Sequence, residues 1–237
     1  MQTKEIYFQR YIKKLPLAFF LLAAVMMSLL LFAVLAHEVL GEKEDNFDFS
    51  VFNYLSSHVI TPRLTPVMEG ISFFASGIFL LVAYVILIAF YFYKKEKRRA
   101  LEILSVGLIG VLINYFMKLL YQRPRPSHPL VNPLQTFSFP SGHAMSAFVF
   151  YGLLIYLVWK THLSKPLKWV AAFFMGLLAL AIGFSRVYLR VHYASDVIAG
   201  FCLGFVWICF AVWLLERVEK KTSMEVSKSN PSTKQTP

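Results

Sequence analysis

Cysteine is nearly absent from this sequence, and its scarcity excludes several kinds of protein. Only Cys202 and Cys209 occur among 237 residues. On a helix, seven residues rise about 10 Å, which is too far for a disulfide. No cysteine spacing typical of a metal site is present. We therefore expect both thiols to serve in packing, and we find no support for redox chemistry.

Charge is also scarce, at 16% of the chain against 57% hydrophobic residues, which is too apolar for an ordinary soluble domain. Several uncharged runs reach the roughly 20 residues that a membrane-spanning helix requires, and the shorter ones can extend into flanking interfacial residues. The first lacks a small-residue cleavage site, so we expect a retained helix. The sequence predicts an all-α integral membrane protein, a bundle of six transmembrane helices. The runs cover about residues 15–37, 70–93, 103–117, 143–159, 169–185 and 197–215.

Acidic residues number 13 against 24 basic ones, a formal net charge of +11. The distribution of the basic residues argues against a nucleic-acid partner. If both termini are cytoplasmic, the cytoplasmic segments hold 17 of the 24, which is the asymmetry of the positive-inside rule. We therefore expect a multi-pass protein of the cell membrane with both termini inside. The exceptions on the outward face are Lys43, Arg63, Lys118, Arg123, Arg125, Arg186 and Arg190.

The first outward loop predicts a short amphipathic helix lying in the membrane interface. Phe49, Phe52 and Leu55 recur there at near-helical spacing, and Asp45 and Asp48 precede them as possible caps. This helix either covers the bundle or forms a wall of the substrate entrance.

The end of the chain carries two further patterns. Residues 222–237 are rich in Ser, Thr, Lys and Pro and predict a disordered cytoplasmic tail, which leaves residues 1–221 as one membrane domain. Gly200 and Gly204 form a G-x-x-x-G pair that indicates close helix packing, either within the bundle or between subunits. The oligomeric state is left open.

Three polar clusters lie at or near the ends of apolar runs, where the predicted topology brings all of them to the outward face. Charged groups at membrane depth are costly and mark a functional site by default. The clusters are Lys118 with Arg125-Pro126, then Pro140-Ser141-Gly142-His143, and then Ser185-Arg186 with His192 and Asp196.

The first two clusters can bind an anion. Lys118 ends a helix, and Arg125 follows in a turn; Arg donates paired hydrogen bonds to phosphate while Lys adds a point charge. Ser141 and the free N–H groups of the next helix can seat an anion. Gly142 allows close backbone approach, and His143 can protonate a leaving oxygen. The alternatives are a lysine that extends to the interface and a simple helix cap.

In the third cluster, His192 and Asp196 are four residues apart, so a helical turn can place the carboxylate beside the imidazole. A carboxylate that holds one ring nitrogen orients the other for attack. The alternatives are a structural pair between two helices, or a metal site with His143, in which several cations would lie beside another cation.

Together, the clusters resemble the signature of the type 2 phosphatidic acid phosphatase superfamily: Lys-x6-Arg-Pro, Pro-Ser-Gly-His and Ser-Arg-x5-His-x3-Asp. Every fixed position is present, and the order agrees over about residues 70–216. The resemblance implies a metal-independent phosphohydrolase without a cofactor. His192 would be the nucleophile that forms a phosphohistidine, Asp196 would orient it, and His143 would be the general acid and base. The phosphoryl oxygens would be held by Lys118, Arg125, Ser141, Gly142 and Arg186, whereas Arg123 and Arg190 lie outside the signature.

The resemblance further implies a lipid phosphate as substrate, at the outer face of the cytoplasmic membrane. Phosphatidylglycerol phosphate is the first expectation, with phosphatidic acid and similar lipids beside it. An isoprenoid diphosphate such as that of undecaprenol is the alternative. A non-catalytic lipid-phosphate binder or transporter is a third, but it would require loss of the attacking histidine or charges spread along several spans. The related haloperoxidases are soluble, and the six apolar runs exclude them.

Overall fold

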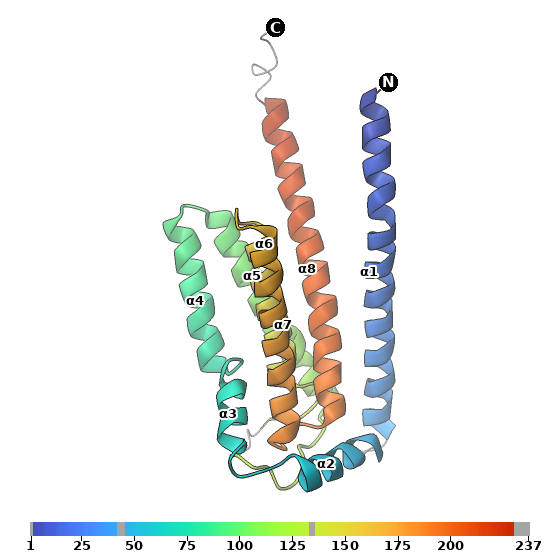
Figure 1. The fold of residues 1–237 in the computed structure, drawn as a ribbon, viewed down its shortest axis with the longest axis vertical. Coiled ribbons are helices and arrows are strands. Elements are labelled where there is room, and N and C mark those ends of the chain that lie inside the picture. Colours follow the sequence, from blue (N-terminus) through green and yellow to red (C-terminus); the bar gives the residue numbers. More distant parts are fainter. Residues whose placement is uncertain (1, 42–45, 133–135, 230–237) are drawn as a thin grey trace.

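The computed structural model describes residues 2–41, 46–132 and 136–229, and in these ranges every regular element is a helix. For residues 2–17 and 222–229 only the backbone is described. Six helical segments of the described chain are long and apolar enough to cross a membrane, which confirms the predicted number. They form an elongated bundle (Figure 1).

The described helices are numbered in chain order. Helix α8 continues past residue 221, where the sequence predicts the start of a tail, and ends at Ser229. Residues 230–237 lie outside the described residues. The domain boundary at residue 221 therefore stays a prediction. The bounds are α1 (Gln2–Gly41), α2 (Asn46–His58), α3 (Thr65–Phe73), α4 (Gly77–Tyr93), α5 (Lys97–Tyr121), α6 (Gly142–Trp159), α7 (Lys165–Tyr188) and α8 (Ala194–Ser229).

Helix α6 occupies the centre of the bundle. It packs against α5, α7 and α8, whereas α1 lies mainly along α8 (Figure 1). Half of the α6 span is buried, compared with 6% of the α1 span. The main core lies between α5, α6 and α8, where Ile103, Met145 and Leu153 are almost completely buried. Because α6 begins at the Pro-Ser-Gly-His motif, its central position brings that motif into the interior.

The second span consists of two helices rather than one. Helix α3 ends at Phe73, and Ser76 begins α4 by accepting a hydrogen bond at its side-chain oxygen from the backbone N–H of Phe79, at 3.2 Å. Serine is preferred at the N-cap position because its short side chain accepts a hydrogen bond from a free N–H of the first turn. The break leaves Ser72 at the end of α3, beside Arg186 of α7.

The G-x-x-x-G pair packs α8 against α6 within the bundle. A Cβ atom at Gly200 would lie 2.7 Å from the carbonyl oxygen of Ser141, and one at Gly204 would lie 3.1 Å from that of Met145. This answers the question that the sequence left open. Cys202 and Cys209 are both free, as predicted.

Helix α2 lies across one end of the bundle (Figure 1) and confirms the predicted short helix. Leu55 is buried and Phe52 is half-buried, but Phe49 is exposed, so the apolar face is narrower than expected. Asp48 lies inside the first turn and is buried, where it contacts Arg123 and Ser195 across the bundle. The second possible cap, Asp45, lies outside the described residues.

Candidate active site

The three clusters meet at the end of the bundle that α2 covers. Lys118 lies on the last turn of α5, Arg125 in the connection to α6, and Arg186 near the end of α7. His192 precedes α8, and Asp196 lies in its first turn. The convergence predicted from topology is confirmed, because His143 on the first turn of α6 lies within electrostatic range of the cations and of the second histidine. These neighbours are Arg186, His192, Arg125 and Lys118.

His192 and Asp196 form a buried pair. The distance from His192 Nδ1 to Asp196 Oδ2 is 3.4 Å, and neither side chain is more than 2% exposed. The same oxygen accepts hydrogen bonds from the backbone N–H of Tyr193 at 2.9 Å and from the hydroxyl of Ser138. These contacts hold the carboxylate at one edge of the imidazole.

The partners of His192 determine which ring nitrogen carries the lone pair. Arg125 Nη1 lies 3.3 Å from Nε2, and a guanidinium can only donate. Nε2 is therefore the acceptor, and Nδ1 carries the proton, which faces Asp196 Oδ2 at 3.4 Å and the hydroxyl oxygen of Ser138 at 3.3 Å. Burial lowers the pKa of His192 well below its usual range, so the ring is neutral near pH 7. The geometry leaves a nucleophilic Nε2 among the cations.

Three cations gather around the two histidines without a fixed counter-charge. In the described part of the chain, none of Lys118, Arg125 and Arg186 forms a salt bridge. Lys118 donates to the carbonyl oxygens of residues 137 and 138, and Arg125 donates to that of Val191 at 2.7 Å. Burial lowers the pKa of Arg125, because charge is costly away from water. Such a cluster is suited to an anion.

Arg186 offers a further buried donor to an anion. Its Nη1 donates to the hydroxyl of Ser72 at 2.5 Å, which fixes the side chain from α3. Its Nε is buried and has no hydrogen-bond partner in the described structure. A buried donor without an acceptor is costly, and a phosphoryl oxygen is an acceptor that would satisfy it.

The start of α6 shows why the motif contains serine and glycine. Ser141 is the N-cap, with its Oγ 3.4 Å from the backbone nitrogen of Ala144, and its own N–H donates to the Asp196 carbonyl at 2.9 Å. The predicted cap is therefore confirmed. A Cβ at Gly142 would lie 3.1 Å from Asn114 Oδ1, so glycine permits the close approach of α6 to α5. The same Cβ would lie 3.9 Å from Lys118 Cε, so Gly142 adjoins this cation. Contact of Ser141 and Gly142 with substrate stays a prediction.

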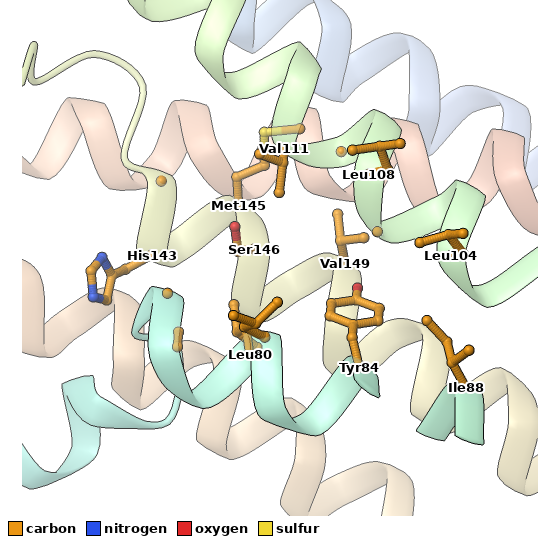
Figure 2. A pocket seen from close by; sticks show the side chains of 16 residues that line it. Leu80, Tyr84, Ile88, Leu104, Leu108, Val111, His143, Met145, Ser146 and Val149 are labelled. Carbon is orange, nitrogen blue, oxygen red and sulfur yellow. The ribbon is translucent and has the colours of Figure 1, made fainter. Parts of the chain in front are cut away.

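An apolar groove of about 520 Å³ begins at His143 and runs between α4, α5 and α6 (Figure 2). His143 lies at one end of the groove, and most of the side chains along the rest of it are aliphatic. A groove of this size between membrane helices can take up a lipid chain. The side chains along it include Leu80, Tyr84 and Ile88 of α4, Leu104, Leu108 and Val111 of α5, and Met145 and Val149 of α6.

Sequence reasoning missed several residues around Asp196. Arg123 was left out of the site, but its Nη1 donates to Asp196 Oδ1 at 2.8 Å. Asp48 and Ser138 also belong to this network. Ser138 and Arg123 lie only a few positions from predicted site residues, and that proximity was the only available signal. Arg190, also left out, donates to Ser56 on α2.

Comparisons with known proteins agree with the motifs. The model of the PAP2 superfamily matches residues 99–220. Phosphatidylglycerophosphatase B of Bacillus subtilis is 37% identical over 67% of this chain and 79% of its own. Undecaprenyl-diphosphatase BcrC of the same organism is 28% identical over 69% of this chain and 82% of its own.

A solved structure supports the same assignment. The crystal structure of a transmembrane PAP2-type phosphatidylglycerolphosphate phosphatase from Bacillus subtilis matches with a TM-score of 0.71 and 32% identity. The match covers 82% of this chain and 96% of that one. The family model, the relatives and the fold place the protein among membrane lipid phosphatases. The chain belongs to the PAP2 superfamily.

Proposed function

We propose that this protein removes the terminal phosphate of phosphatidylglycerol phosphate by way of a phosphohistidine. The observation that carries the proposal is the cluster of Lys118, Arg125 and Arg186 around the two histidines, with Arg125 Nη1 3.3 Å from His192 Nε2 and a buried Nε of Arg186 that has no acceptor among the described residues. A phosphate monoester carries up to two negative charges and several acceptor oxygens, which complement three cations.

In the first step, His192 Nε2 attacks phosphorus and the bond from phosphorus to the lipid oxygen breaks. His143 gives its proton to that oxygen, so the lipid leaves as an alcohol. Asp196 stabilises the positive charge that develops on the His192 ring, because its Oδ2 faces Nδ1. Positioning and charge stabilisation are the main contributions that phosphoryl transfer requires.

In the second step, His143 takes a proton from water, and the resulting hydroxide attacks the phosphohistidine. The bond between phosphorus and Nε2 breaks, inorganic phosphate is released and both histidines return to their starting states. Lys118, Arg125, Arg186 and the N-terminus of α6, with Ser141 and Gly142, hold the phosphoryl oxygens in both steps. No metal ion is part of this scheme.

The apolar groove explains why the substrate is a lipid. Because the groove starts at His143 and continues between α4, α5 and α6 (Figure 2), a phosphate at His192 would leave an attached hydrocarbon chain at its mouth. Burying one methylene contributes about 0.8 kcal/mol, so a long chain adds substantially to binding. The groove fits acyl and prenyl chains alike.

The headgroup is assigned by likeness to the relatives. Both the solved structure and the 37% identical relative carry names for the dephosphorylation of phosphatidylglycerol phosphate. The less similar BcrC carries the name of an undecaprenyl-diphosphatase, which makes an isoprenoid diphosphate the second candidate. The positive-inside asymmetry supports an outward-facing site with both termini in the cytoplasm.

A substrate panel tests the proposal. The purified protein is given phosphatidylglycerol phosphate, phosphatidic acid and undecaprenyl diphosphate in matched detergent micelles, with and without a chelator, and released phosphate is measured. We expect the first lipid to give the highest kcat/KM and the chelator to have no effect. Loss of activity with the chelator would contradict the metal-independent scheme, and a preference for undecaprenyl diphosphate would reassign the substrate.

The His192→Ala variant tests the nucleophile in the same assay. It removes the attacking nitrogen, and we expect activity to fall by a factor of about 10⁴ or more, as for other enzymes that lose a nucleophile. Elution of the variant as a folded protein in detergent shows that the loss of activity is not due to unfolding. The matched control is His162→Ala, which replaces an exposed histidine in the loop before α7. Substantial turnover by folded His192→Ala would refute the phosphohistidine.

A further inference from the structure

A buried ionic network lies behind the catalytic pair and includes a residue of α2. Asp48 is 1% exposed, Arg123 is 3% exposed and Asp196 is fully buried. Arg123 Nη2 donates to Asp48 Oδ2 at 2.9 Å, and its Nη1 donates to Asp196 Oδ1 at 2.8 Å. A single guanidinium therefore bridges the two carboxylates, one from α2 and one from α8.

The two oxygens of Asp196 have separate tasks. Oδ2 faces His192 Nδ1, whereas Oδ1 is occupied by Arg123. Because the guanidinium is planar and rigid, fixing Oδ1 also restricts rotation of the whole carboxylate. We propose that Arg123 and Asp48 are positioning residues that hold Asp196 against the nucleophile. This inference rests on the proposed phosphohistidine mechanism and extends it to α2.

Asp48 holds Arg123 in turn and also fixes the start of α8. Its Oδ1 accepts from the backbone N–H of Ser195 at 2.9 Å, and its Oδ2 accepts from the Ser195 hydroxyl at 2.5 Å. The guanidinium carbon of Arg123 lies 4.0 Å from the centre of the Tyr193 ring, which adds a cation–π contact. Ser195 thus contacts Asp48 of α2 directly, and Tyr193 is linked to Asp48 through Arg123.

The charges explain why two carboxylates are needed. Arg123 and Asp196 alone would form a neutral pair beside His192. With Asp48 the network carries a formal charge of −1, which favours the positive ring that forms as His192 is phosphorylated. Asp48 thereby allows Arg123 to orient Asp196 without cancelling its charge.

The consequence is a role for α2 in catalysis. The sequence left two roles for this helix, a cover or a wall of the substrate entrance. The contacts of Asp48 assign a third, in which docking of α2 completes the support of the catalytic pair. Displacement of α2 would then impair the chemical step even if lipid binding were intact.

Conservative variants test the positioning role. Arg123→Lys keeps the charge but loses the planar fork, and Asp48→Asn keeps the shape but loses the charge. We expect kcat for the preferred lipid to fall about 10- to 100-fold in each, with little change in KM. The matched controls are the exposed Arg63→Lys and Glu69→Gln at the same end of the bundle, which should retain wild-type kcat. Melting midpoints in detergent verify folding.

A double-mutant comparison separates positioning from substrate binding. If Arg123 acts through Asp196, adding Arg123→Lys to Asp196→Asn should cause no further loss of kcat. The inference would be overturned if the two losses of kcat multiplied in the double variant. It would also be overturned if Arg123→Lys alone raised KM and left kcat unchanged. If Arg123→Lys does not fold, Asp48→Asn carries the test, because it removes the charge that holds Arg123; unchanged kcat in folded Asp48→Asn would also overturn the inference. Inactive wild-type protein would instead refute the proposed function.

Discussion

At the scale of single residues, the proposed phosphohistidine mechanism depends on the surroundings of one imidazole. His192 has a carboxylate at Nδ1 and a guanidinium at Nε2. Burial lowers its pKa and outweighs the opposing effect of Asp196. The ring is thus kept neutral, which is the form that can attack phosphorus. The cations nearby act in the same direction by disfavouring a second positive charge.

The lowered pKa of His192 predicts a loss of stability in acid. In the unfolded chain its pKa is about 6.5. Because the folded pKa is lower, the stabilisation is complete above about pH 6.5 and is lost as the pH falls toward the folded value. Between about pH 7.5 and 5, the melting midpoint of the wild type in detergent should fall by about 4–8 °C more than that of His192→Gln, which corresponds to about 2 kcal/mol.

Substitution of an exposed histidine is the control for this measurement. His162→Gln removes a titratable ring in the loop before α7, and its midpoint should follow that of the wild type. If the melting midpoints of the wild type and of His192→Gln fell equally between about pH 7.5 and 5, the lowered pKa of His192 would not be the cause.

At the scale of elements, the site depends on how closely α8 approaches α6. Gly200 lies against the backbone carbonyl oxygen of Ser141. The backbone N–H of Ser141 in turn donates to the carbonyl oxygen of Asp196. The helix that carries Asp196 and the helix that begins at the Pro-Ser-Gly-His motif therefore meet backbone to backbone. Two small residues four positions apart provide this contact.

A single methyl group should disturb this contact. In Gly200→Ala the new Cβ would lie 2.7 Å from the Ser141 carbonyl oxygen, and backbone cannot yield as a flexible side chain can. We expect a loss of about 1–3 kcal/mol in stability, seen as a lower melting midpoint in detergent, together with reduced activity. The control is Gly176→Ala on α7, where nothing lies within 4 Å of the new atom. Equal midpoints for the two variants would show that α8 can shift without cost.

At the scale of the whole molecule, the two ends of the bundle differ in chemistry. The α4–α5 and α6–α7 connections lie at the end where α1 begins and α8 finishes (Figure 1). That end carries ordinary surface ion pairs, such as Lys160 with Glu219 at 2.9 Å. The opposite end carries the unpaired cations of the site. From the positive-inside rule we expect the site to face away from the cytoplasm, and this orientation stays a prediction.

Labelling of single cysteines tests this orientation. In a background with Cys202→Ala and Cys209→Ala, Ser127→Cys adds a thiol at the exposed site end and Thr161→Cys adds one at the exposed opposite end. A membrane-impermeant maleimide added to intact cells should label only the first, and lysis should be required for the second. The reverse pattern would place the site on the cytoplasmic side.

The sequence alone determined the membrane class, the number of spans and the residues of the three motifs. These features are local, because the length of an apolar run and the spacing within a motif do not depend on the rest of the chain. Only the tertiary structure decided the break before Ser76, the packing of Gly200 inside the bundle and the network of Asp48 and Arg123. Asp48 and Arg123 are 75 positions apart. Contacts of that kind depend on how the helices pack, and no pattern within either segment specifies them.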